Sequence, residues 1–302
     1  MRQITEKAHA KINLGLDVLG RRADGYHLVR MIMQTIGLHD DLVLEQTGDG
    51  AEEDFSVTLE TDSSEIPAGS DNLLCRAMDR MASVCGLRGH YHVRLTKRIP
   101  VAAGMAGGST DAAAACRALR TLSGAQVTDE QLQAMLLPLG ADIPYCVTGG
   151  TQLSEGIGEV LTPLPEPPAC ALVIVKPPVA VSTAQVYRDL DSLPDYRHPD
   201  IDGQIEALRS GDLCRLAGLC DNVLELVTGE AYPMIGALEK FFTERGALVS
   251  RMSGSGPTVF AIFAEEDREK AAAALQEMET DARFTDCRGF LTSFSSGRSR
   301  EE

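Results

Sequence analysis

The chain of 302 residues is poor in basic residues, and this shortage argues against two classes of partner. It has 28 Lys and Arg against 44 Asp and Glu, which gives a formal net charge of −16 at pH 7. A surface of this sign repels nucleic acid and anionic membranes, so we expect neither as a partner. No run of about 18 apolar residues indicates a membrane span, and no signal or transit peptide opens the sequence. We therefore expect a bacterial, cytoplasmic protein.

Paired cysteines of the metal-binding or redox type are also missing. None of the eight cysteines forms a C-x-x-C pair, and most lie inside apolar helix or strand patterns. Such positions are typical of reduced core thiols in a reducing compartment, and they predict no zinc site. The eight are Cys75, Cys85, Cys116, Cys146, Cys170, Cys214, Cys220 and Cys287.

Two common nucleotide-binding loops are absent, but a glycine-rich loop of another kind is present. Residues 100–110 do not end in Gly-Lys-Ser/Thr, and their glycines do not give G-x-G-x-x-G. A strand-like alternation around Val93 precedes the loop, and the helix-forming run 112–122 follows it, with Ser109 or Thr110 where an N-cap is expected. A loop entering a helix in this way directs unpaired backbone N–H groups and the positive end of a dipole at one spot. Phosphate binding and a plain tight turn are the two interpretations.

A polar pair interrupts the first apolar pattern of the chain. Residues 8–18 alternate as a strand with one apolar face, and Lys11 and Asn13 lie together on the other. The ordinary fate of such a lysine is solvation, and the alternative is a charged site. Tyr26 and His27 leave the turn 21–25, where binding residues are often presented.

Two further segments carry candidate chemistry. Asp142 precedes Ile-Pro at the start of an expected short helix, where an N-cap is the usual role. Residues 252–257, Met-Ser-Gly-Ser-Gly-Pro, form a glycine turn between two expected strands.

Prolines crowd one short stretch, at positions 163, 165, 167 and 168, and this composition predicts a boundary between domains 1–163 and 164–302. The remaining patterns predict α+β structure. We expect a strand at 55–61, a helix from Ser70 or Asp71 to Gly86, a capping box at 128–131, and a continuous helix at 212–226.

In their order along the chain, Lys11-Ile-Asn13, the loop 100–110 and Met252–Pro257 resemble the GHMP kinases. The motifs Asp24-Gly-Tyr-His27, Gly140-Ala-Asp-Ile-Pro144 and Glu155-Gly-Ile-Gly-Glu159 narrow the resemblance to one family among them, the 4-diphosphocytidyl-2-C-methyl-D-erythritol kinases. The similarity runs from about Ala8 to Phe294. It implies a two-domain fold, with an N-terminal domain like ribosomal protein S5 domain 2 and a ferredoxin-like C-terminal domain.

The resemblance also implies an activity. ATP would donate its γ-phosphoryl group, with Mg²⁺, to the 2-hydroxyl of a cytidine diphosphate-linked polyol in the non-mevalonate isoprenoid pathway. Another GHMP kinase, of the homoserine or mevalonate type, and a catalytically silent nucleotide-binding relative are the alternatives. The stacking residues at 26 and 27 argue against the first, and retention of both Lys11 and Asp142 argues against the second.

Site residues follow from the same resemblance. Asp142 would be the general base, with Lys11 as its electrostatic partner. Asn13, Tyr26, His27 and, on a looser match, Tyr187 would bind the substrate. Ser109 and Thr110 are candidates to hold Mg²⁺, but no glutamate matches the metal ligand of mevalonate kinase, so the metal ligands and the role of Asp111 stay open. The residues expected to bind ATP are Pro100, Val101, Ala102, Ala103, Gly104, Met105, Ala106, Gly107, Gly108, Ser109 and Thr110.

Overall fold

The computed structural model describes residues 2–49 and 54–297 and forms two compact units. Unit one comprises Met1–Ala10, Leu38–Val101 and Ala106–Gly149, and unit two comprises Lys11–Gly37, Ala102–Met105 and Gly150–Glu302. Two long strands, β1 (Arg2–Arg21) and β2 (His27–Gly48), contribute one part to each unit. The units interleave along the chain and so divide it differently from the expected domains 1–163 and 164–302, which stay a prediction.

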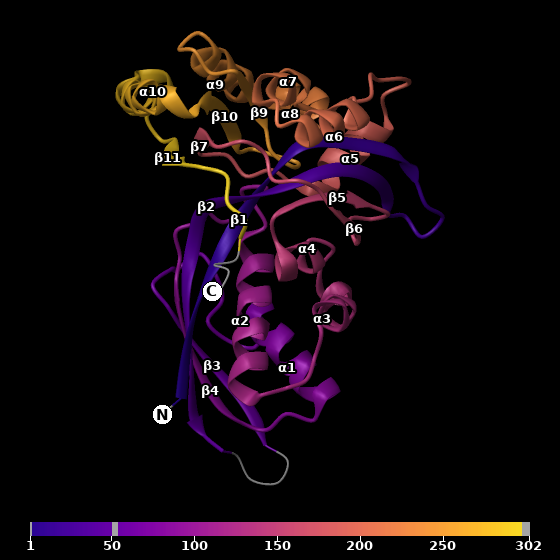
Figure 1. Ribbon diagram of the computed structural model, residues 1–302, viewed down its shortest axis with the longest axis vertical. Coiled ribbons are helices and arrows are strands. Elements are labelled where there is room, and N and C mark those ends of the chain that lie inside the picture. Colours follow the sequence, from indigo (N-terminus) through magenta and orange to yellow (C-terminus); the bar gives the residue numbers. More distant parts are fainter. Residues whose placement is uncertain (1, 50–53, 298–302) are drawn as a thin grey trace. The chain divides into compact units, whose positions relative to one another are not determined.

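Unit one packs helices against a sheet, with the helices gathered on one side of β3 and β4 (Figure 1). Strand β4 pairs antiparallel with the second part of β2 and parallel with β3. Helix α2 is alanine-rich, and five consecutive residues, 112–116, are fully buried, because small side chains let neighbouring helices approach closely. The elements are β3 (Phe55–Thr61), α1 (Leu73–Cys85), β4 (Gly89–Thr96), α2 (Gly107–Ser123), α3 (Asp129–Leu136), the 3₁₀ turn η1 (Leu137–Leu139) and α4 (Ile143–Thr148).

Local signals predicted much of this unit. The strand at 55–61 is confirmed, and α1 ends as expected at Gly86, which adopts φ 64°. The capping box at Thr128 and Gln131 is present with both of its hydrogen bonds. The start of α1 differs slightly, because Asn72 supplies the N-cap by accepting the N–H of Leu74.

Unit two contains a four-stranded antiparallel sheet in the order β11-β7-β10-β9. If these four strands are numbered 1 to 4 in chain order, their order across the sheet is 4-1-3-2, which is the expected ferredoxin-like arrangement. Helices α9 and α10 pack against it (Figure 1). The strands are β5 (Thr151–Glu155), β6 (Val160–Pro163), β7 (Cys170–Lys176), β8 (Asp221–Asn222), β9 (Val249–Met252), β10 (Val259–Ala264) and β11 (Arg288–Thr292). The helices are α5 (Thr183–Asp191), α6 (Ile201–Ser210), α7 (Leu213–Leu219), α8 (Glu225–Ala231), α9 (Met234–Thr243) and α10 (Arg268–Thr280), with 3₁₀ turns η2 (Glu265–Asp267) and η3 (Ala282–Phe284).

The continuous helix expected at 212–226 is wrong. Helix α7 stops at Leu219, and β8 then pairs in parallel with β1, placing Asp221 opposite Gly15 and Asn222 opposite Leu16. The N–H of Val223 continues this connection by donating to the carbonyl of Leu16. Long-range pairing therefore overrides the helical propensity of this stretch.

Candidate active site

The polar pair on β1 is buried, so the ordinary alternative of a solvated strand lysine does not apply to Lys11. Residues 10–18 are buried on both faces of the strand, and Lys11 and Asn13 are only 5% and 1% exposed. The Lys11 ammonium donates to Asn13 Oδ1 at 2.8 Å, and the Asn13 amide donates to Met31 Sδ at 3.2 Å. Lysine side chains are seldom buried, because their charge must then be offset by other groups.

Unit two brings three of the predicted motifs together. The N–H of Asn13 donates to Ser253 Oγ at 3.2 Å, and the N–H of Lys11 donates to the carbonyl of Met105 at 3.2 Å. Gly104 lies against the glycine turn, where a Cβ would stand 2.7 Å from the Ser253 carbonyl and 3.1 Å from that of Gly256. With φ +70° at Gly104 as well, only glycine allows this approach. The backbone of the glycine turn therefore approaches the glycine-rich loop closely.

Three residues that the sequence patterns did not single out hold this glycine turn. The Asn222 amide donates to the carbonyls of Met252 and Gly254 at 2.9 and 2.8 Å. Glu225 Oε2 accepts the N–H of Met252, and Thr228 Oγ1 donates to the carbonyl of Ser255. The sequence contained one signal for them, since Asp221-Asn222 is a pair that favours turns over helix interiors.

Two carboxyl groups, of Glu225 and Glu239, lie together beside the glycine turn. Burial, together with the charge of Glu225 and a hydrogen bond to it, raises the pKa of Glu239 to about 9. Two neighbouring carboxylates repel each other, so the proximity of Glu225 disfavours the ionised form of Glu239. Its Oε1 has no hydrogen-bond partner.

The glycine-rich loop enters α2 earlier than expected. The helix begins at Gly107 with Ala106 as N-cap, so the placement of the N-cap at Ser109 or Thr110 is wrong, and these two residues are the third and fourth of the helix. The reason is the left-handed turn at Ala106, φ 59°, which directs the chain straight into the glycine pair. The N-cap residue Ala106 makes no side-chain hydrogen bond to the first amides of the helix, and a helix start of this kind suits an anion.

Alternate residues of the loop are left-handed, since Ala102 has φ 52°, Gly104 φ 70° and Ala106 φ 59°. Two of the three are alanines, for which this conformation is strained. Strained backbone persists where surrounding structure holds it, and it gathers at ligand-binding segments.

Asp142 occupies the N-cap position of α4 but does not act as a cap. Its backbone is in the right-handed helical region, and its side chain makes no capping hydrogen bond to the helix. Its backbone carbonyl accepts the N–H of Cys146. Asp142 belongs to unit one and Lys11 to unit two, so their pairing stays a prediction.

The three residues expected to bind the cytosine ring, Tyr26, His27 and Tyr187, lie in unit two and differ in exposure. The rings of His27 and Tyr187 stack with centroids 4.6 Å apart at 28°, and His27 Nε2 lies 2.8 Å from Asp191 Oδ1. Tyr26, beside them in sequence, is 59% exposed. Tyr187, assigned on the looser match, thus lies directly against His27.

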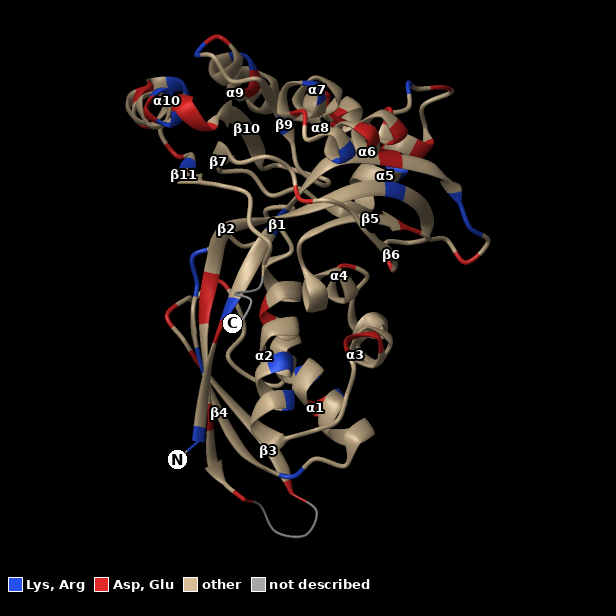
Figure 2. Ribbon diagram, in the orientation of Figure 1, with Lys and Arg blue, Asp and Glu red and all other residues tan. Residues whose placement is uncertain are grey.

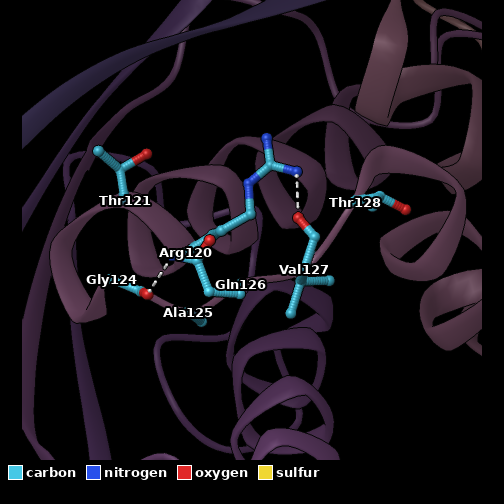
Figure 3. A pocket seen from close by; sticks show the side chains of 7 residues that line it. All are labelled: Arg120, Thr121, Gly124, Ala125, Gln126, Val127 and Thr128. Carbon is cyan, nitrogen blue, oxygen red and sulfur yellow. Dashed lines mark hydrogen bonds between the residues drawn. The ribbon is translucent and has the colours of Figure 1, made fainter.

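A surface pocket lies at the C-terminal end of α2, away from the glycine-rich loop. Its lining residues run from Arg120, in the last turn of the helix, to Thr128, beyond its end (Figure 3). The Arg120 guanidinium already donates to the carbonyl of Val127 (Figure 3), and it also pairs with Asp129. Arg120 lies 13 residues after Gly107 along α2, so the pocket is roughly 20 Å from the start of the helix at 1.5 Å per residue.

The distribution of charge, of metal-ligating side chains and of apolar helices limits the kinds of site that the described residues can form. Acidic residues are seen on α3 in one unit and on α6 and α10 in the other, so the negative charge is not confined to one element (Figure 2). Within residues 2–49 and 54–297, no three His, Cys, Asp or Glu side chains gather as a metal site. Among the helices of the same ranges, none has the length and apolar character needed to cross a bilayer.

Comparison with known proteins gives the family. Residues 72–150 match the GHMP kinases N terminal domain, and residues 204–281 match the GHMP kinases C terminal model. The 4-diphosphocytidyl-2-C-methyl-D-erythritol kinase of Lachnospira eligens is 46% identical over 283 residues, covering 94% of this chain and 96% of the relative. The chain belongs to this family of GHMP kinases.

Solved structures agree with the family at the level of the fold. A crystal structure of 4-(cytidine 5′-diphospho)-2C-methyl-D-erythritol kinase superimposes with a TM-score of 0.78 at 30% identity, covering 97% of this chain and 99% of that one. Homoserine kinase from Cytophaga hutchinsonii gives a TM-score of 0.75 at 19% identity, covering 98% and 95%. The second likeness shows the fold alone, and together they confirm the expected two-domain GHMP kinase fold.

Proposed function

We propose that this chain is an ATP-dependent kinase that phosphorylates the 2-hydroxyl of 4-diphosphocytidyl-2-C-methyl-D-erythritol, giving the 2-phosphate and ADP. The observation that carries the proposal is a buried lysine on β1, 5% exposed, joined through Asn13 to a glycine turn that packs against the glycine-rich loop. This arrangement occurs in a chain 46% identical, over nearly its whole length, to a kinase of that name.

The uncapped start of α2 supports a site for the ATP phosphates. The loop contains no lysine or arginine, so its attraction for phosphate rests on backbone N–H groups and the helix dipole. The left-handed residues 102, 104 and 106 fix the loop before ATP arrives, which lowers the entropy that binding must overcome.

Asp142 is proposed as the general base. An alcohol attacks phosphorus well only if its proton is removed as the new bond forms. A carboxylate that is half-buried and makes no capping bond to its helix suits that role better than a structural cap. The Lys11 ammonium would favour the ionised form of this base and stabilise charge on the transferring group.

Among the residues considered as Mg²⁺ ligands, one side chain is suitable. Mg²⁺ in kinases is held by substrate phosphates and waters with one or two protein oxygens, and it neutralises the charge that develops on the phosphates. Ser109, half-buried in the first turn of α2, is the candidate ligand, whereas Thr110 is 2% exposed. Asp111 does not fit, because its Oδ2 is bound to Lys97.

The cytosine ring is proposed to bind at Tyr26, His27 and Tyr187. A base sandwiched between two rings needs about 7 Å between them, twice the usual carbon–carbon contact distance. The 4.6 Å separation of His27 and Tyr187 leaves no such space. The base would therefore stack on a free face of one of the aromatic rings or displace Tyr187 from His27.

The test is a coupled assay of ADP release, run on the purified chain with three alcohols: the cytidyl methylerythritol, homoserine and mevalonate. We expect turnover with the first and at least about a thousandfold lower kcat/KM with the others, because a site built to hold a base leaves its groups unpaired without one. Equal or greater turnover of homoserine or mevalonate would identify a different GHMP kinase. No ADP release with any of them, while ATP still binds, would favour a silent relative.

A further inference from the structure

A lysine and two aspartates form a buried cluster in unit one, beside the start of α2. The Lys97 ammonium lies 2.5 Å from Asp40 Oδ2 and 2.7 Å from Asp111 Oδ2. The three side chains are 7%, 0% and 4% exposed. Burying three charged groups costs desolvation free energy, which their close pairing with one another must offset. A cluster of this kind is therefore a candidate for a functional role.

The cluster joins the two ends of the glycine-rich loop. Asp40, on β2, uses its second oxygen to accept the N–H groups of Arg98 and Ile99, which fixes the chain entering the loop. Asp111 directly follows the loop and lies one turn after the start of α2. Gly107, the first residue of α2, touches the entering chain, since a Cβ there would be 3.1 Å from Ile99 Cγ2 and 3.5 Å from Lys97 Nζ.

The charge of the cluster is held near zero. Burial and the neighbouring Asp40 charge outweigh the attraction of Lys97 and raise the pKa of Asp111 to about 8. One lysine and two carboxyl groups that share a proton are neutral together, which avoids adding negative charge beside a phosphate site. Asp111 Oδ1, buried and without a hydrogen-bond partner, is an atom that can carry this proton.

Other charged groups on the chain entering the loop and on α2 have partners of their own. On the chain that enters the loop, Arg98 pairs with Asp41 of β2. On α2 itself, Arg117 pairs with Glu6 of β1, and Arg120 pairs with Asp129 of α3. Lys97 and Asp40 are therefore the charges that set the state of Asp111.

We propose that Asp111, Lys97 and Asp40 are positioning residues for ATP, which clamp the two ends of the glycine-rich loop so that the first amides of α2 face the phosphates. This inference rests on the proposed binding of ATP by the loop. It assigns to Asp111 a part in ATP affinity without contact with either ATP or Mg²⁺, since its carboxyl group is turned onto Lys97.

The test measures binding of MgATP by titration calorimetry at pH 7 to the full chain and three variants. Asp111→Ala removes the clamp, Asp111→Asn keeps an oxygen for Lys97, and Leu119→Ala opens a cavity farther along α2, where the side chain is fully buried. We expect Asp111→Ala to raise the Kd about tenfold or more. Asp111→Asn and Leu119→Ala should stay within about threefold, although Leu119→Ala lowers the melting temperature. Equal Kd values for Asp111→Ala and Leu119→Ala would overturn the proposal, because a structural role alone predicts that result.

A pH series gives a second readout that survives if Asp111→Ala does not fold. As the pH rises from 7 to 9, Asp111 loses its proton in the unchanged chain, and the Kd should rise several-fold. Asp111→Asn cannot ionise, so its Kd should change less over the same range. Parallel profiles for the two proteins would contradict the inference. If the unchanged chain does not bind MgATP at all, the proposed function fails first, and the positioning role falls with it.

Discussion

Two regions of unit two differ sharply in how far their side chains are fixed. Lys11, Asn13 and Ser253 are 5%, 1% and 0% exposed and are joined by hydrogen bonds. At the region proposed to bind the cytosine ring, Tyr26 is 59% exposed, and Tyr187 stacks on His27 with no room for a base between the two rings. The first region is arranged before any ligand binds, whereas the second must rearrange or be covered when the base arrives.

The chemistry assigned to each region accounts for this difference. Phosphoryl transfer needs charges at fixed positions, because stabilisation of a transition state is lost when groups must reorganise. Stacking on a flat base tolerates adjustment, and exposed aromatic rings lose little conformational entropy on binding. Substitutions in the buried region should therefore affect turnover and stability, and those in the exposed region should affect substrate affinity.

The largest effect is expected at Asp142. Asp142→Asn keeps the shape of the side chain but cannot accept the proton, so turnover should fall roughly 10²–10⁴-fold, with substrate affinities nearly unchanged. Lys11→Met should also lower turnover, and the double variant should be little worse than the poorer single one, since the two groups act as a unit.

The control for Asp142 is Asn72→Ala, which removes a true helix cap in the same unit. It should lower the melting temperature, at a cost of about 1 kcal/mol, with normal turnover. If Asp142→Asn behaves like this control, with a lower melting temperature and near-normal turnover, Asp142 is a structural residue and the base assignment is wrong.

The next effect concerns the contact of the loop with the glycine turn. Gly104→Ala places a methyl group 2.7 Å from the Ser253 carbonyl, at φ +70°, and should destabilise the fold by about 2–4 kcal/mol. Gly108→Ala is the matched control, because its nearest neighbour would be Leu73 Cδ2 at 3.9 Å. Chemical denaturation compares the two, and equal stabilities would show that the close approach is not required.

A smaller effect, confined to the nucleoside, is expected at the aromatic rings. Tyr26→Ala and Tyr187→Ala should each weaken binding of the cytidyl substrate by about 1–3 kcal/mol, the range for loss of a stacked base. Calorimetry with ATP on the same variants should give the affinity of the unchanged chain. Normal affinity for the cytidyl substrate in both variants would mean that the base binds elsewhere.

The smallest effect should appear as a pH dependence of stability at Glu239. Its pKa lies near 9 in the folded chain and 4.5 is its ordinary value, so folding takes up a proton between these values. Stability from this group is therefore lost as the pH rises from about 4.5 toward 9. Glu239→Gln should flatten that loss and stabilise the fold at pH 8 by about 1 kcal/mol or more. An unchanged pH profile of the melting temperature would show that Glu239 is ionised in the fold.

Sequence patterns predicted the elements whose signals are local. The cap glycine at 86, the capping box at Thr128 and the strand at 55–61 depend on neighbours within a few residues. The break after Leu219 was missed because it depends on β1 and on carbonyls about 30 residues away, which Asn222 binds. No local pattern contains that information.

The candidate site was predicted by motif rather than by environment. Lys11 and Asn13 were singled out, but their burial was not foreseen, because an alternating pattern does not tell what covers its polar face. Lys97 was not singled out at all, since its importance comes from meeting Asp40 and Asp111, which are 57 and 14 residues distant in sequence. The assignments of the catalytic, ATP-binding and substrate-binding residues stay predictions.

Hydrogen exchange of backbone amides, followed by mass spectrometry, tests the contrast between the two regions most directly. In the free chain, residues 10–14 and 249–258 should exchange slowly, and addition of the cytidyl substrate should change them little. Residues 19–28 and 183–191 should exchange faster in the free chain and slow markedly when that substrate is added, more than with ATP alone. The reverse pattern, with substrate protecting residues 249–258 and leaving 19–28 unchanged, would contradict a fixed catalytic region and a base-binding region completed by its ligand.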